Sequence, residues 1–290
     1  MDKKDKLRKY VMGTCLLCFF ISIGGMAFTS YGRWRDSHML GRQQAQLMEQ
    51  KAVAEKEGNM AGRSLAAEVS EEIIGASVDT ELKILPEYQS MHGQNKDLIG
   101  WLSIEGTVID YPVMQTLEHE DYYLYNDFYG NYNANGCLIM DTDSAAGIGT
   151  EANGYVNGTP PSTNLIIHGH NMKSGEMFGD LDLYAQEGYG KEHRIICFDS
   201  LYEHREYELV AVFYSQVYRV KDNVFKYYKF FEADTEEEFE YWRRNIEQLS
   251  LYGTGVETEF GDEFITLNCC SYHVENGRFV VVGKRIGTLD

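Results

Sequence analysis

The sequence predicts a mainly β protein: an eight-stranded barrel that follows N-terminal helices and carries one inserted helix before its last two strands. From residue 98 onward, short runs rich in Val, Ile, Tyr and Phe alternate with turn residues, which is the pattern of strands. One amphipathic stretch, 235–251, interrupts these runs late in the chain. Many strands with a single late helix favour a barrel over a parallel α/β sheet.

The N-terminal part predicts a membrane anchor. Residues 10–31 contain no Lys, Arg, Asp or Glu and are about long enough to span a bilayer. Five basic residues lie within 1–9, so the positive-inside rule predicts a cytoplasmic tail at 1–9, a transmembrane anchor at 10–31 and an exported remainder. A cleaved signal peptide is the alternative. The apolar run is long for a signal peptide and Ala27-Phe28-Thr29 is a poor cleavage site, which favours an uncleaved anchor.

The polar segment after the anchor predicts a spacer. Residues 32–80 are of mixed charge and predict a helical or flexible stalk, with Gly58 and Gly62 as helix breaks. Pro86 predicts the start of a short helix, because proline is tolerated in a first helical turn. The folded domain is expected to occupy residues 81–290.

Each predicted element of this domain has a local reason. The strands are expected at 98–104, 108–113, 137–140, 164–167, 194–198, 207–218, 263–270 and 278–286. The segment 145–163 is rich in Gly, Asn, Ser, Thr and Pro and predicts a long loop. Thr235 and Glu238 have the spacing of a capping box, and apolar residues follow at helical intervals, so the inserted helix should begin there.

The charge balance excludes one class of partner. The chain has 26 basic and 45 acidic residues, and 21 of the basic and 43 of the acidic residues lie beyond residue 30. Phosphate polymers would be repelled by such an exported part, so no nucleic-acid partner is expected.

Two cysteines of the exported part, Cys137 and Cys197, are expected as buried thiols. A disulfide between them is the alternative, since exported proteins can form one. Cysteine pairs with zinc-finger spacing are absent from the exported sequence, and no cofactor is predicted.

Cys270 is the candidate nucleophile. It ends the predicted strand 263–270, and Arg278 begins the next strand after a short loop, so the two should lie close together. A guanidinium favours the thiolate, which is the nucleophilic form. Adjacent Cys269 should point to the opposite face of the strand. Without further support, a cysteine at a strand end is more often a buried small side chain.

A proton carrier is needed beside such a thiolate, and histidine is the usual one near neutral pH. His168 and His170 flank Gly169 where a predicted strand ends, so the strand would deliver them and the loop would expose them. A metal-binding His-x-His pair is the alternative, because alternate residues share a face. A third ligand is not evident in the sequence, and no metal is predicted.

These residues together resemble those of the sortases. Besides Cys270 and Arg278, the resemblance rests on Gly169-His170-Asn171-Met172 and on Met177-Phe178-Gly179-Asp180-Leu181. Supporting segments lie at 95–102, 109–115 and 122–124, and the details, including the inserted helix, resemble class B. The resemblance covers about residues 82–286.

The resemblance assigns roles residue by residue. The family's Thr-Leu-x-Thr-Cys signature falls on 266–270, which makes Cys270 the nucleophile and puts Cys269 where Thr is usual. The family histidine falls on His170 as general acid and base. The family arginine falls on Arg278, which would stabilise the substrate carbonyl and the oxyanion. His168 stands where the family often has Tyr.

The resemblance also implies a reaction and a place. Cys270 would cleave an Asn-Pro-x-Thr/Ser-like C-terminal sorting motif of a secreted protein and form a thioacyl enzyme. The acyl group would pass to an amine of a peptidoglycan precursor or of a pilin lysine, on the outer face of the cell membrane. A cysteine peptidase that only hydrolyses, and a catalytically inactive membrane-anchored binding module, are the alternatives.

Overall fold

The computed structural model describes residues 3–68 and 82–288. The chain divides into two compact units, Met1–Gln43 and Gln44–Asp290. The expected boundary between stalk and domain, at residues 80 and 81, lies outside the described residues, as do residues 1–2 of the expected tail and the last two residues of the chain.

Helix α1 (Lys3–Glu68) runs without a break, so the helix breaks expected at Gly58 and Gly62 are wrong. A glycine inside a helix costs only about 1 kcal/mol relative to alanine, which neighbouring residues offset. At Gly58 a Cβ would lie 3.2 Å from Pro86, so the glycine allows close packing of the two helices there. Within Met12–Gly58, α1 has a segment long and apolar enough to cross a membrane, by length and composition.

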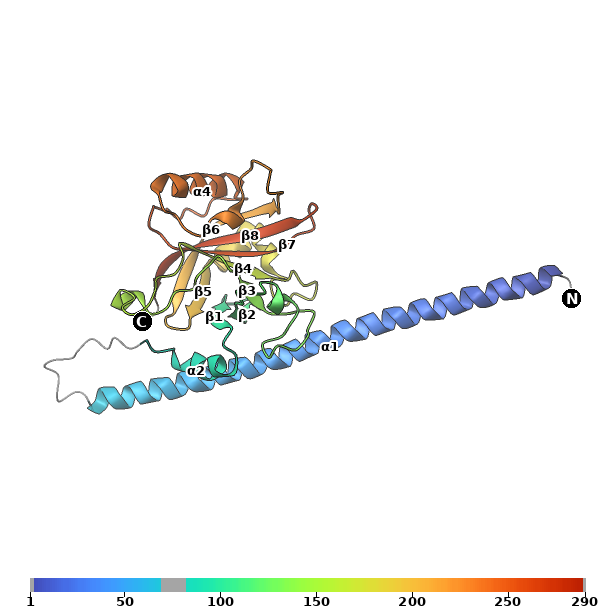
Figure 1. The fold of residues 1–290 in the computed structure, drawn as a ribbon, viewed down its shortest axis with the longest axis horizontal. Coiled ribbons are helices and arrows are strands. Elements are labelled where there is room, and N and C mark those ends of the chain that lie inside the picture. The colour runs from blue at the N-terminus through green and yellow to red at the C-terminus, as the bar shows by residue number, and fades with distance from the viewer. Residues whose placement is uncertain (1–2, 69–81, 289–290) are drawn as a thin grey trace. The chain divides into compact units, whose positions relative to one another are not determined.

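Eight strands close a barrel in the order β1-β2-β3-β4-β7-β8-β6-β5 (Figure 1). They are β1 (Leu98–Ser103), β2 (Asp110–Met114), β3 (Leu138–Met140), β4 (Asn164–Gly169), β5 (Ile195–Ser200), β6 (Arg205–Gln216), β7 (Phe264–Cys270) and β8 (Gly277–Thr288). The pairs β2–β3 and β4–β7 are parallel and the other six are antiparallel. The predicted eight-stranded barrel is confirmed.

Two of the helices in the Gln44–Asp290 unit begin where the sequence predicts. Helix α2 (Pro86–Gln94) starts at its proline. Helix α4 (Glu236–Leu249) is capped by Thr235, whose Oγ1 accepts a hydrogen bond of 3.3 Å from the backbone N–H of Glu238. The short elements not expected from the sequence are α3 (Glu187–Glu192), η2 (Tyr122–Leu124), η3 (Glu151–Asn153), η4 (Leu181–Ala185) and η5 (Tyr227–Lys229).

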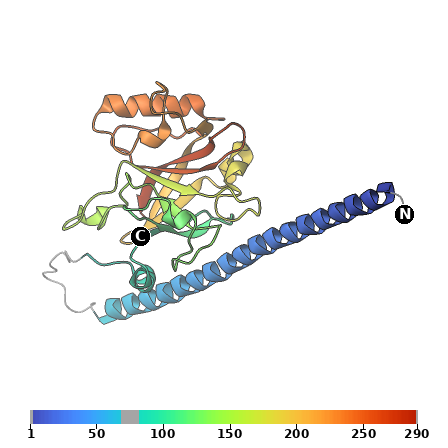
Figure 2. The ribbon, with the colours of Figure 1, turned by 45° about the vertical axis from the view of Figure 1, so that its right-hand side comes forward.

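Helix α4 covers the outer face of the barrel beside β6, β7 and β8, as Figures 1 and 2 show. Its apolar residues Phe239, Trp242 and Ile246 are buried, and the Trp242 ring lies 4.7 Å from the ring of Phe264 between centroids. This packing fixes which face of β7 points outward. Since side chains alternate along a strand, Asn268 and Cys270 share the face of Phe264.

Candidate active site

Three neighbouring strands end together and bring the sequence-predicted residues into one row. Parallel β4 and β7 pair Gly169 with Cys269, so His170, the next residue, comes beside Cys270. Antiparallel β7 and β8 pair Cys270 with Arg278. Because neighbouring strands lie about 4.8 Å apart, His170, Cys270 and Arg278 follow one another across the strand ends. All three line one cavity of about 500 Å³.

The rest of the cavity lining comes from two loops and from residues further back on the strands. The segment that leads into and out of η2 contributes Glu120, Asp121, Leu124 and Tyr125, and the chain after β6 contributes Val217. The cavity is therefore a groove whose lining includes both acidic and apolar side chains.

Strand alternation separates the two adjacent cysteines. Cys269 is only 2% exposed, whereas Cys270 is exposed to solvent. Burial raises the pKa of the Cys269 thiol, so this thiol stays protonated near neutral pH. Of the two thiols, only that of Cys270 is accessible from the groove.

All the cysteines are free thiols, so the alternative disulfide between Cys137 and Cys197 is not formed. Cys137 is buried, and Cys197 is partly buried with its pKa raised by burial to about 11. Neither of them lines the groove.

The imidazole of His170 is held from one side. Its Nε2 lies 2.8 Å from the carbonyl oxygen of Leu124. A carbonyl can only accept, so Nε2 carries a hydrogen and donates it, which leaves Nδ1 as the nitrogen available to exchange a proton. The Tyr125 ring lies against the imidazole, with 5.7 Å between ring centroids.

The guanidinium of Arg278 keeps its charge available. It is partly buried, and its Nη1 donates to the carbonyl of Gly277 at 3.0 Å. Within the part of the chain that the structure describes, no carboxylate forms an ion pair with Arg278. A cation without a carboxylate partner can stabilise a thiolate or a developing oxyanion.

Two neighbours of His170 position the row, and sequence reasoning gave neither a role. Asn171 donates from Nδ2 to the carbonyl oxygen of Cys270 at 2.9 Å, which ties the end of β4 to the end of β7. At Gly169 a Cβ would lie 2.6 Å from side-chain atoms of Leu138 and of Phe178, so only glycine fits. Both residues belong to the motif Gly169-His170-Asn171-Met172, so this motif could have indicated from sequence that they contribute to the site.

His168 belongs to a different set of contacts from His170. Its Nε2 lies 3.2 Å from Asp141 Oδ2, and its Nδ1 lies 2.9 Å from Asn268 Nδ2. Burial acts to raise the pKa of Asp141, but hydrogen bonds from His168 and from the Asp143 backbone N–H hold that pKa below its ordinary value. Asp141 is therefore ionised near neutral pH.

Three of these groups could hold a metal ion. The ligand atoms of Glu120, Asp141 and His168 all lie within 4.8 Å of one another. Burial, and then the Asp141 carboxylate, raise the pKa of Glu120. His170 is not part of this set, so the His-x-His pair considered from sequence is not the ligand pair that the fold offers. Glu120 and Asp141 could not be predicted as possible metal ligands from the sequence, because they lie on segments far in the chain from His168.

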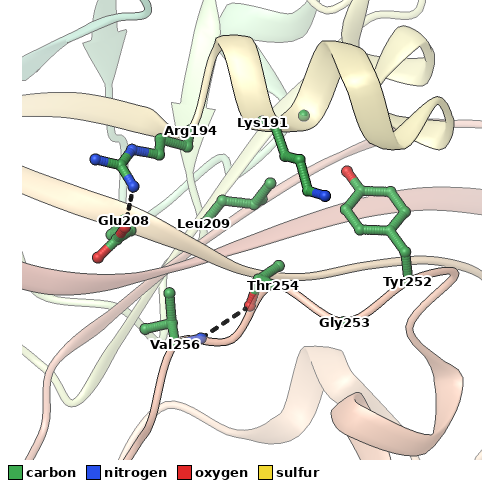
Figure 3. Close-up of a pocket in the computed structure, with 9 residues that line it drawn as sticks. Lys191, Arg194, Glu208, Leu209, Tyr252, Gly253, Thr254 and Val256 are labelled. Carbon is green, nitrogen blue, oxygen red and sulfur yellow. Dashed lines mark hydrogen bonds and ion pairs between the residues drawn. The ribbon is translucent and has the colours of Figure 1, made fainter.

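A second cavity, of about 340 Å³, lies between α3 and the chain that follows α4 (Figure 3). Its cations are paired: Arg194 lies 3.2 Å from Glu208, and Lys191 lies 2.6 Å from Glu187. Tyr252 closes one end and donates to the carbonyl of Tyr184 at 2.8 Å. None of the predicted site residues lines this cavity.

Comparison with known proteins gives a consistent set of relatives, although no family model matches the chain. Sortase B of Listeria monocytogenes is 29% identical over 213 residues, which cover 73% of this chain and 78% of that protein. Sortase B of Staphylococcus aureus is 28% identical over 205 residues, which cover 70% of this chain and 76% of that protein.

Solved structures resemble the fold over a similar range. The Staphylococcus aureus sortase B–substrate complex matches with a TM-score of 0.59 and 23% identity, over 82% of this chain and 97% of that chain. A Bacillus anthracis protein described as similar to sortase B matches with a TM-score of 0.61 and 24% identity, over 84% of this chain and 94% of that chain.

Proposed function

Because the chain belongs to the sortase B family, we propose that it is a cysteine transpeptidase. It cleaves a C-terminal sorting motif of secreted proteins through a thioacyl enzyme and transfers the acyl group to an amine. The observation that carries this proposal is the row of His170, Cys270 and Arg278 on three adjacent strand ends around one groove. A nucleophile, a proton carrier and an unpaired cation are what acyl transfer through a thiolate requires.

In the first half-reaction the Cys270 thiolate attacks the scissile carbonyl carbon, and the carbonyl oxygen becomes an oxyanion. The Arg278 guanidinium lies opposite Cys270 across β7 and β8 and stabilises that negative charge. His170 gives the proton on Nδ1 to the leaving amine, while its Nε2–H stays on the Leu124 carbonyl. The C–N bond breaks and the thioester forms.

In the second half-reaction an amine attacks the thioester. His170 accepts the proton that this amine loses, a new amide bond forms, and Cys270 leaves again as a thiolate. Water in place of the amine would give hydrolysis. We propose an Asn-Pro-x-Thr/Ser-like motif as acyl donor and an amine of a cell-wall precursor or of a pilin lysine as acceptor. The structure of Staphylococcus aureus sortase B was determined as a complex with a substrate, which supports the binding of such a substrate by this chain.

The apolar segment of α1 supports a location at the cell membrane. We propose that residues 10–31 anchor the chain as a single span, with 1–9 in the cytoplasm, 32–80 as stalk and the catalytic domain from 81 onward outside. The enzyme, its membrane-borne substrates and lipid-linked precursors would then share one face of the membrane.

The proposal is tested with the unit Gln44–Asp290, incubated with a quenched Asn-Pro-x-Thr peptide and an added amine. The expected products are the cleaved peptide and its amine adduct, and both should be lost in Cys270→Ala and reduced strongly in His170→Ala. Cleavage without any adduct would assign a hydrolysing peptidase instead. Peptide binding without cleavage would assign an inactive binding module. Full activity in Cys270→Ala would overturn the mechanism.

A further inference from the structure

A hydrogen-bonded row of side chains lies beside the row of His170, Cys270 and Arg278. It links Asp141, which follows β3, through His168 on β4 to Asn268 on β7. His168 and Asn268 are direct register partners, and both line the groove. Asn268 lies two residues before Cys270 on the same face of β7, about 7 Å away along the strand.

The chemistry of the row fixes the direction of each hydrogen bond. The Asp141 carboxylate can only accept, so Nε2 of His168 carries a hydrogen, and in the Nε2–H tautomer Nδ1 can only accept. Asn268 must therefore turn its NH₂ group toward Nδ1. The distances agree with this, since Nδ1 lies 2.9 Å from Nδ2 of Asn268 and 3.2 Å from its Oδ1.

This direction has a consequence for the groove. With its NH₂ group committed to His168, Asn268 keeps Oδ1 as its remaining acceptor on the wall of the groove, where the residue is only 2% exposed. A histidine in the other tautomer would donate from Nδ1 to Oδ1 and turn the NH₂ group outward instead. The Asp141 carboxylate thus decides, through His168, whether Asn268 presents an acceptor or a donor.

We propose that Asp141 and His168 are positioning residues that hold the Asn268 carboxamide with its oxygen toward the acyl-donor peptide. The group recognised is a hydrogen-bond donor close to the scissile bond, either a side-chain hydroxyl or a backbone N–H. This inference rests on the proposed function and names the part of the substrate that the same groove selects. The Leu124 carbonyl holds His170, and Asn171 holds the Cys270 backbone, without any contact from Asp141, His168 or Asn268. Changes in the row should therefore affect peptide binding rather than the positions of His170 and Cys270.

The first readout does not depend on activity. Nitrogen-15 NMR of the free protein should show His168 as the Nε2–H tautomer, and Asp141→Asn should shift its population toward Nδ1–H. A ring that is Nδ1–H in the parent protein would overturn the proposal, whatever the protein does to peptides.

The second readout is steady-state cleavage of the quenched peptide. Loss of one neutral hydrogen bond predicts a KM about three- to tenfold higher in Asp141→Asn and in His168→Gln, with kcat changed less than about twofold. Asp143→Asn is the matched control, since it removes the same charge from an exposed side chain two residues away and should leave KM unchanged. An equal rise of KM in Asp143→Asn would show that charge and not orientation matters, and would overturn the proposal.

A double-mutant cycle isolates the route through Asn268. In an Asn268→Ala background, Asp141→Asn should have no further effect on KM, whereas effects that multiply would contradict the proposal. A peptide with Val in place of the motif's Thr separates the two donors: lost sensitivity to Asp141→Asn assigns the hydroxyl, and retained sensitivity assigns a backbone N–H. The alkylation rate of Cys270 by iodoacetamide should stay constant across the variants, which shows that they are folded. A parent protein that makes the amine adduct while these variants keep its KM would refute this inference alone, whereas a parent that makes no adduct would refute the proposed function.

Discussion

At the scale of single residues, Arg278 places a positive charge directly opposite Cys270. It is the register partner of Cys270, and no carboxylate among the described residues forms an ion pair with it. Its fixed charge can act twice in one turnover, first on the thiolate and then on the oxyanion. A guanidinium suits this better than an ammonium because its planar fork can donate two hydrogen bonds at once.

Arg278→Gln should lower kcat/KM for the quenched peptide by about 10²- to 10³-fold, the usual effect of removing an oxyanion donor. Arg278→Lys should recover part of the loss, because it restores the charge but not the fork. Arg194→Gln is the control: Arg194 is an exposed arginine paired with Glu208 in the second cavity, and its loss should not change kcat/KM. Equal rates for Arg278→Gln and the parent protein would remove Arg278 from the mechanism.

At the scale of elements, the ends of β4, β7 and β8 set the spacing of the reacting groups. Gly169 is a tight point of β4, because the strand passes close to Leu138 of β3 and to Phe178 in the loop after His170. Phe178 also donates its backbone N–H to the carbonyl of His170 at 3.0 Å. Any displacement of β4 there moves His170 directly.

Gly169→Ala should therefore destabilise the fold and slow catalysis together. The added Cβ would overlap two buried side chains, which predicts a loss of about 1–3 kcal/mol in the free energy of unfolding. Urea unfolding measures this loss, and kcat should fall because His170 is displaced. Gly188→Ala in α3 is the control, since nothing lies within 4 Å of its Cβ position. Unchanged stability and kcat in Gly169→Ala would contradict the close packing.

The sequence predicts these elements well where the signal is local. Alternation along one strand is enough to separate Cys269 from Cys270, and a capping box is enough to start α4. The row from Asp141 through His168 to Asn268 could not be predicted, because it depends on the register of β4 with β7 and those residues lie far apart in the chain. The helix breaks expected in α1 are wrong because the low helix propensity of glycine is only a weak local signal. At Gly58, packing against Pro86 outweighs it.

At the scale of the whole Gln44–Asp290 unit, a largely buried ionic cluster joins two helices, α1 and α2, to strand β5 and the turn that follows it. His204 lies 3.0 Å from Asp199 and 3.2 Å from Glu87 of α2, and Lys51 of α1 lies 3.3 Å from Asp199. The hydrogen bond to Asp199, and then the one to Glu87, raise the pKa of His204 from 6.5 to about 10. Burial acts to raise the pKa values of Asp199 and Glu87, but their bonds with His204 hold both below their ordinary values.

This cluster predicts how stability depends on pH. The folded state binds the His204 proton more tightly than the unfolded chain does, so its contribution is complete below pH 6.5 and is lost as the pH rises through about 10. The two carboxylates contribute above their ordinary pKa values of 3.8 and 4.5, and their contribution is lost as the pH falls below that range.

The Tm of the parent protein should therefore decline between pH 6.5 and pH 10, and His204→Gln should flatten that decline. Thermal melts followed by circular dichroism at a series of pH values measure the effect. His119→Gln, which changes an exposed histidine, should leave the decline as it is. The same slope in His204→Gln and the parent protein would show that the cluster does not hold this proton.

In the proposed reaction Cys270, and not its neighbour Cys269, carries the acyl group. The most direct measurement is to trap the acyl enzyme with an Asn-Pro-x-Thr peptide, without added amine, and to map the adduct by mass spectrometry of proteolytic fragments. The expected result is the acyl mass on Cys270, an unmodified thiol at Cys269, and the same adduct in Cys269→Ala. An adduct on Cys269, or complete peptide turnover in Cys270→Ala, would contradict it.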